Sequence, residues 1–154
     1  MHKLVLYIKT YRPDFNRVER LMSSIEQYNM DKIPLYISVN DPDYNYFRKN
    51  LQGNFTLLKD SDLVVTKMKD GWRLQAIVKP HFYRLGVCEN YLCVDSDSVF
   101  IRPFYTADFM YDDNTPYTIM HENKSFLDTL EILGKDSATI FHINALKSIR
   151  ARFG

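Results

Sequence analysis

Cysteine is scarce in this sequence, which excludes two common ways of stabilising a small domain. The chain has 154 residues and 2 cysteines, Cys88 and Cys93. Two cysteines form no disulfide framework and cannot supply the four thiolates of a structural zinc site. Both lie in or beside an apolar run, so we expect reduced, buried thiols. A chain of this length needs no such cross-link, because it buries roughly 70% of its unfolded surface.

Long apolar runs and an excess of one charge are also absent. The first apolar run, Leu4–Ile8, is five residues long, whereas a secretory signal needs about 7 apolar residues and a membrane span about 20. With 20 Lys and Arg against 19 Asp and Glu, the formal net charge is +1. This balance lacks the basic footprint of a DNA-binding domain. We therefore expect a cytoplasmic protein with no nucleic-acid partner.

Aromatic residues, by contrast, are plentiful. They make up 14% of the chain, with 11 Tyr and 10 Phe but a single Trp, Trp72. Half-polar aromatic rings suit a protein with grooves to line, and they are equally good material for a core.

The order of apolar patterns predicts an α/β fold. Leu4–Ile8 is an unbroken apolar run, which is typical of a strand buried on both faces, and Leu35–Val39 is the next strand. Between them a helix is expected to begin at Pro13. Its apolar stripe recurs at three- and four-residue spacing: Phe15, Val18, Met22 and Ile25. Two strands joined by a helix predict a parallel crossover.

The remainder of the chain continues this alternation. We expect a short helix around Phe47 that Gly53 closes, a helix from Gly71 to Gly86 that Pro80 ends or kinks near Lys79, and further strands and helices. The strands are expected at 55–58, 63–65 and 91–94, and the later helices at 125–133 and 139–152. Together these elements predict a single Rossmann-like α/β domain over residues 1–154, with a mostly parallel sheet flanked by helices.

Three predicted strands end in polar clusters, and ligands bind outside the carboxyl ends of such strands. The clusters are Thr10-Tyr11-Arg12, Asn40-Asp41 and Asp95-Ser96-Asp97. Two carboxylates at the end of a buried strand are costly without a cation. Oxygen ligands favour Mg²⁺ or Mn²⁺, and Mg²⁺ commonly takes one or two carboxylates together with substrate phosphates. The third cluster therefore predicts a nucleoside diphosphate that a metal ion bridges to the protein.

Two other interpretations of this cluster stay open at this point. An Asp-Ser-Asp sequence at a strand end is often only a solvated turn. An apolar strand followed by Asp95-x-Asp97 also fits the nucleophile motif of haloacid dehalogenase-like phosphatases, in which the first Asp attacks a phosphoryl group. That motif usually opens its domain, however, and here it lies in the second half of the chain.

A wider pattern favours the nucleotide. Gly71-Trp72-x-x-Gln75-x-x-x-Lys79 followed by Asp95-x-Asp97 resembles the GT-A glycosyltransferases, in particular a bacterial-type subgroup. The resemblance extends over about Leu4 to Pro103. It implies that residues 1–103 bind a nucleoside-diphosphate-sugar, such as a UDP- or GDP-sugar, and that Asp95 and Asp97 hold Mn²⁺ or Mg²⁺. Residues 104–154 would then be a partial or short acceptor-side part.

Spacing adds independent support. Trp72, Gln75 and Lys79 share one helix face, from which Lys79 and Gln75 would supply a cation and an amide to the diphosphate and the sugar hydroxyls. Lys79 and Asp97 are the expected catalytic residues, acting on charge that develops at the leaving diphosphate. The other expected donor-site residues are Thr10, Tyr11, Arg12, Asn40, Trp72, Asp95 and Ser96. Core packing explains Trp72 and Tyr11 equally well, and solvent exposure explains Arg12.

The acceptor side is less defined. An inverting enzyme needs a carboxylate base, and the candidates are Asp112, Asp113, Glu122 and Asp128. A further metal ligand would come from His121 or His142. Basic residues gather near the end of the chain, Lys147, Arg150 and Arg152, where they would attract a phospholipid-linked acceptor or simply form a solvated helix face. A glycan, lipid-linked or protein acceptor, peripheral membrane contact and a non-catalytic nucleotide-sugar-binding module or fragment all stay open.

Overall fold

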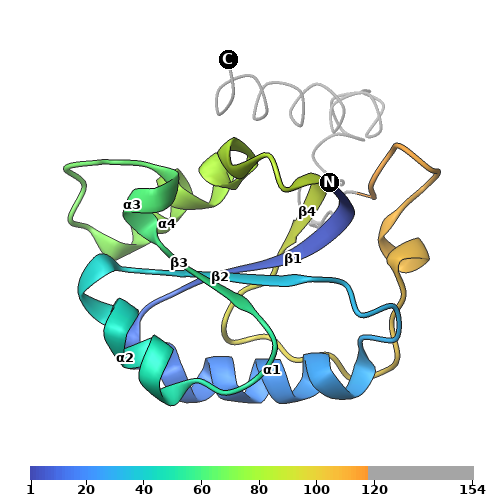
Figure 1. Cartoon of the computed structure of the whole chain (residues 1–154), viewed down its shortest axis with the longest axis horizontal. Coiled ribbons are helices and arrows are strands. Elements are labelled where there is room, and N and C mark those ends of the chain that lie inside the picture. The colour runs from blue at the N-terminus through green and yellow to red at the C-terminus, as the bar shows by residue number, and fades with distance from the viewer. Residues whose placement is uncertain (118–154) are drawn as a thin grey trace, which may run out of the picture. The chain divides into compact units, whose positions relative to one another are not determined.

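Four parallel strands form the sheet of this protein, whose computed structural model describes residues 1–117 (Figure 1). The strands are β1 (His2–Thr10), β2 (Leu35–Val39), β3 (Thr56–Lys59) and β4 (Cys88–Cys93). Their order is β3-β2-β1-β4, and all three pairings are parallel. Helices cover both faces of this sheet, so the predicted Rossmann-like α/β fold is confirmed.

The central strand β1 is buried because helices cover both of its faces. Its alternate side chains enter two different cores. Leu4, Leu6 and Ile8 pack with α1 (Phe15–Tyr28) and α2 (Tyr44–Asn50), which lie below the sheet in Figure 1. Val5 and Tyr7 pack on the other face, with residues of α3 (Asp60–Leu63), α4 (Gly71–Val78) and the 3-10 helix η3 (Lys79–Leu85).

Several predicted boundaries are correct to within a few residues. β2 is as predicted, and the α1 stripe is buried at Val18, Met22 and Ile25. α1 begins at Phe15, because Arg12–Asp14 form a separate 3-10 turn around Pro13. As expected, α4 ends at Val78, and the chain continues as η3, in which Pro80 lacks the N–H that an α-helix would use.

Gly53 does not close α2, contrary to our prediction. The helix ends at Asn50, and Leu51 caps it in an extended conformation. Gly53 lies in the following loop with φ of +126°, and a Cβ there would stand 2.8 Å from Cε of Met22. Positive φ and the close approach to α1 both require glycine at this position.

The strand predicted at 63–65 is also wrong. Leu63 ends the short helix α3, which the Asp62 carboxylate stabilises by accepting a hydrogen bond from the Lys59 N–H at 2.8 Å. Leu63 is buried while Val65 is exposed, so the apolar run divides between core and solvent. Residues 64–70 have no regular structure.

β4 differs from the buried strand that its apolar sequence predicts. Among residues 1–117 it pairs only with β1. Tyr91 and Leu92 are half-buried, and Cys93 is exposed. Both thiols are free, but the prediction that both are buried is wrong, because Cys88 is half-buried and Cys93 is exposed.

The chain divides into two units, Met1–Pro116 and Tyr117–Gly154. The division we expected at residues 103 and 104 stays a prediction, and the helices expected at 125–133 and 139–152 lie outside the described residues. Within residues 1–117, no helix combines the length and the apolar character needed to cross a membrane.

Candidate functional site

The strand order determines where a ligand site belongs in this sheet. From β1 the chain adds β2 and β3 on one side through α1 and α2, and β4 joins on the other side after α3 and α4. The direction in which strands are added to the sheet therefore reverses between β1 and β4. Open α/β sheets bind ligands at such a point, outside the carboxyl ends of the strands. We call the carboxyl ends of β1 and β4 the crevice. The segments Thr10–Arg12 and Val94–Asp97 stand at this point.

Two of the predicted site residues meet in this crevice. Nζ of Lys79 lies 2.5 Å from Oδ1 of Asp95, although the two residues are 16 positions apart. The carboxylate is 66% exposed and the lysine side chain 21%. The hydroxyl of Tyr91 on β4 donates to the carbonyl oxygens of Lys79 and Pro80, at 3.3 and 3.1 Å. The junction between α4 and η3, which presents Lys79, is thus attached to β4.

The residues after β4 alternate between solvent and interior. Asp95 and Asp97 are exposed, whereas Ser96 is buried. The Ser96 hydroxyl donates to Oδ2 of Asp14 at 3.0 Å, and Asp14 also forms a 2.8 Å ion pair with Arg17. Ser96, predicted to contact the donor, therefore links this loop to the start of α1. Asp14 was not predicted, because nothing in the local sequence distinguishes it from an ordinary acidic residue of a helical first turn.

The two exposed carboxylates can be tested as metal ligands. Asp97 makes no hydrogen bond or ion pair with any other residue of 1–117, and the only ion-pair partner of Asp95 in that range is Lys79. The same residues contain no group of three or more His, Cys, Asp or Glu side chains placed to hold a metal ion. Two carboxylates at a rim fit an ion whose remaining ligands are phosphate oxygens and water.

A buried ion pair near the carboxyl ends of β1 and β2 was not predicted from the sequence. Nζ of Lys9 lies 2.9 Å from Oδ2 of Asp60, and the side chains are 5% and 9% exposed. The Lys9 ammonium also donates to the carbonyl oxygen of Thr10 at 2.7 Å and to Oδ1 of Asn40 at 2.9 Å. Neither Asp60 oxygen makes a hydrogen bond of regular geometry within residues 1–117. The three contacts of Lys9 therefore join the carboxyl ends of β1 and β2 to the start of α3.

Burial dominates the electrostatics of this pair. It lowers the pKa of Lys9 and raises the pKa of Asp60, because both charges have left water, and their mutual attraction opposes both shifts. The like charge of Lys79 further lowers the pKa of Lys9, so the two ammonium groups are near enough to interact. Each ammonium group is paired with a carboxylate, Lys9 with Asp60 and Lys79 with Asp95, and only the second pair is exposed to a ligand.

The three residues that follow β1 have different environments. Thr10 is 1% exposed, and its hydroxyl has no hydrogen-bond partner among the described residues. Tyr11 is exposed. The Arg12 guanidinium lies 4.4 Å above the Tyr46 ring, and the Arg12 backbone N–H donates to Oδ2 of Asp43 at 2.9 Å. Arg12 thus faces α2 rather than the Lys79–Asp95 pair.

Trp72 and Gln75 lie on α4, the helix that ends directly before Lys79. Asp70 caps this helix by accepting a hydrogen bond from the Arg73 N–H at 3.1 Å. Gln75 is half-buried, and Trp72 is 76% exposed. The interpretation of Trp72 as a core residue is therefore wrong.

The described candidate bases lie at the other end of the sheet. Asp113 forms a 3.0 Å ion pair with Lys3, near the start of β1, and Lys3 is about 23 Å from Thr10 along an extended strand. Asp112 accepts hydrogen bonds from the N–H groups of Asn114 and Thr115, both at 2.8 Å, and these bonds lower its pKa. The other acceptor-side candidates lie outside the described residues: Glu122, Asp128, His121, His142, Lys147, Arg150 and Arg152.

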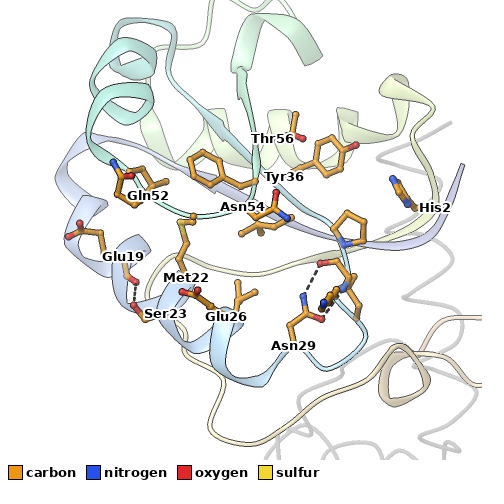
Figure 2. A pocket seen from close by; sticks show the side chains of 18 residues that line it. His2, Glu19, Met22, Ser23, Glu26, Asn29, Tyr36, Gln52, Asn54 and Thr56 are labelled. Atoms are coloured by element: carbon orange, nitrogen blue, oxygen red, sulfur yellow. Dashed lines mark hydrogen bonds between the residues drawn. The ribbon is translucent and has the colours of Figure 1, made fainter.

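A separate hollow of about 780 Å³ lies along α1 (Figure 2). Glu19, Met22 and Glu26 line one side, and the start of β2 and the loop before β3 line the other. Asn29, which faces it, makes two hydrogen bonds with the backbone of Ile33, at 2.8 and 2.9 Å. This hollow is at the amino ends of the strands, away from the crevice.

Comparison with known proteins gives a family but no activity. No curated protein matches this sequence. Residues 3–141 match a family of unknown function, DUF6492. Because the match spans most of the 154 residues, the chain belongs to the DUF6492 family.

Proposed function

We propose that this protein binds a nucleoside-diphosphate-sugar and transfers the sugar to an acceptor, as the resemblance to GT-A glycosyltransferases implies. The observation that supports the proposal best is the Lys79–Asp95 pair, 2.5 Å apart between Nζ and Oδ1, at the carboxyl ends of β1 and β4. Asp97 stands exposed two residues further on. A cation and two carboxylates at this point suit a diphosphate and a divalent ion.

In this proposal each residue has a separate task. Asp95 and Asp97 hold Mn²⁺ or Mg²⁺, which when bound stabilises negative charge on the diphosphate. Lys79 leaves Asp95 and donates hydrogen bonds to the diphosphate oxygen that becomes negative as the sugar departs. Lys9 stays buried with Asp60 and holds the carboxyl ends of β1 and β2 in place. Exposed Tyr11 provides a face against which a base or ribose packs.

The proposal includes a cytoplasmic location, a UDP- or GDP-sugar as donor, and a glycan or lipid-linked acceptor. A non-catalytic nucleotide-sugar-binding module is the second candidate. Among residues 1–117, Asp112 and Asp113, the base candidates considered, lie away from the crevice, and this observation favours the module. Phosphoryl transfer through Asp95 is a third candidate function. The experiments below distinguish it from the other two.

Calorimetry with UDP and GDP, with and without Mn²⁺, tests the binding step. We expect Mn²⁺-dependent binding that Asp97→Asn weakens at least tenfold, because one of two carboxylate ligands is lost. The matched control is Asp113→Asn, which makes the same change at the opposite end of β1. Binding that is absent, or equal in Asp97→Asn and the control, would refute the proposal.

Product analysis separates the three activities. Metal-dependent binding with transfer of the sugar to an acceptor supports the transferase, whereas release of UDP or GDP without transfer leaves the module or fragment open. Binding without release supports the module. Phosphatase activity that Asp95→Asn abolishes and Asp113→Asn retains would support the phosphatase instead.

A further inference from the structure

The segment between α3 and α4 extends away from the sheet, as the green loop on the left of Figure 1 shows. Residues 64–70 have no regular structure. Both ends of the loop are held in the same core, because Val64 and Leu74 pack against the cluster that contains Val78 and Phe82. The loop is therefore fixed at its base while its middle is directed outward.

Side chains along this segment alternate in exposure. Val64 is extended, with φ of −156° and ψ of 134°, and alternate residues of an extended chain point to opposite sides. The half-buried positions are Val64, Thr66 and Met68, and the exposed positions between them are Val65, Lys67 and Lys69. The Met68 N–H donates to the Thr66 hydroxyl oxygen at 3.1 Å. One side of the loop thus presents an aliphatic residue and two lysines to solvent.

The first turn of α4 adds to this surface. Trp72 is 76% exposed and Val65 is 88% exposed, and Arg73 is also exposed. The three cations of residues 64–73 are Lys67, Lys69 and Arg73. The one carboxylate, Asp70, caps α4, and three cations less this one anion give residues 64–73 a formal net charge of +2. Positive charge is therefore concentrated here, in a chain whose formal net charge is only +1.

This combination of groups identifies a partner. Tryptophan prefers the headgroup level of a bilayer, and lysine and arginine are attracted to anionic lipids. A neutral glycan would use the indole ring but would gain nothing from three cations and an exposed valine. We propose that this surface, the basic loop (residues 64–73), docks on an anionic lipid surface, with Trp72 and Val65 in the interface and the three cations on lipid headgroups.

Docking through the basic loop would also position the candidate site. Trp72 lies in the first turn of α4 and Lys79 directly follows its last residue, Val78, so seven residues, or about 10 Å of helix, separate them. A loop seated at headgroup level therefore holds the Lys79–Asp95 pair close to the membrane surface. The inference does not depend on sugar transfer, because lipid binding is measured without any substrate.

The single tryptophan makes the test specific. Trp72 is the only Trp among the 154 residues, so the intrinsic tryptophan fluorescence of the full chain reports on this surface alone. We expect a blue shift, and quenching by brominated lipid, on vesicles of phosphatidylcholine with 30% phosphatidylserine. Pure phosphatidylcholine vesicles should give neither. Raising the salt to 0.5 M should weaken binding, because the interaction is electrostatic.

A charge-matched pair of variants completes the experiment. Each cation near an anionic surface contributes about fivefold to binding, so Lys67→Glu/Lys69→Glu should lower vesicle affinity at least about 25-fold. The control Arg48→Glu/Lys49→Glu makes the same charge change on exposed residues of α2, on the other face of the sheet, and should retain binding. Circular dichroism checks that both variants are folded.

Three results with vesicles would overturn the proposal. They are no binding to anionic vesicles, equal loss of binding in the two charge variants, and co-sedimentation with vesicles without a shift in Trp72 emission. The last result would assign lipid binding to another part of the chain. A blue shift with an acidic protein or a soluble glycan, but not with vesicles, would identify a different partner and would likewise contradict docking on lipid.

Discussion

Replacing Lys9 with methionine is expected to lower the free energy of unfolding by about 3–5 kcal/mol, because the substitution leaves the Asp60 carboxylate buried without its cation. Solvent screening does not reduce this figure much, since the two side chains are only 5% and 9% exposed. The loss is a large fraction of a typical stability of about 5–15 kcal/mol. For a chain of this size it corresponds to a melting temperature lower by roughly 6–20 °C.

Substituting the other member of the pair, Asp60, should lower the free energy of unfolding by less. In Asp60→Asn the Lys9 ammonium keeps two acceptors, the Thr10 carbonyl oxygen and Oδ1 of Asn40. In Lys9→Met the Asp60 carboxylate keeps no hydrogen bond of regular geometry within residues 1–117. The double variant Lys9→Met/Asp60→Asn removes both charges and should recover most of the loss in Lys9→Met.

Urea unfolding followed by circular dichroism measures all three variants, with Lys3→Met/Asp113→Asn as a control that removes an exposed ion pair. The control should change stability by less than about 1 kcal/mol. The reasoning fails if the two single effects simply add in the double variant, since additivity would mean that the charges do not interact. It also fails if Lys9→Met is as stable as the control.

Two further predictions concern pH and backbone conformation. Burial raises the pKa of Tyr91 to about 12 and raises the pKa of Tyr7 as well. The native state therefore keeps protons that the unfolded chain releases above pH 10, and stability should fall as the pH rises from 10 to 12. Urea unfolding at several pH values should show a smaller fall for Tyr91→Phe, and an identical fall would contradict the assignment. Gly53→Ala should lose about 1–3 kcal/mol in urea unfolding, because φ is +126° and the new Cβ meets Met22. An unchanged midpoint would show that the loop adopts another conformation.

Periodicity is the part of the fold that the sequence predicts well. The α1 stripe and the buried run of β1 depend on which residues face one core, and a period of three to four or an unbroken apolar run reveals that directly. The proximity of Lys79 and Asp95 could also be predicted from the sequence. Lys79 shares a helix face with Trp72 and Gln75, and Asp95 follows a strand, so topology alone puts both near one sheet edge.

The Lys9–Asp60 pair could not be predicted from the sequence, because it depends on strand register. Lys9 pairs with Ser38, and Ser38 pairs with Leu58, so Asp60 follows two residues beyond the level of Lys9, where the long lysine side chain reaches it. A shift of one residue would turn Lys9 to the other face. Nothing local to Lys9 or Asp60 encodes that register. The predicted strand at 63–65 failed for a related reason, since apolar content does not distinguish a buried Leu63 from an exposed Val65.

The separation between the buried pair and the exposed rim has an evolutionary consequence. Lys9 and Asp60 support the sheet edge from inside, and we expect the loss of Lys9 alone to cost more stability than the loss of both charges together. Asp97 and the exposed Asp95 carry little of the stability, because substitutions at exposed positions usually alter it by less than about 0.5 kcal/mol. We therefore expect relatives of this protein to differ more readily at the exposed Asp95 and Asp97 than at the buried Lys9–Asp60 pair.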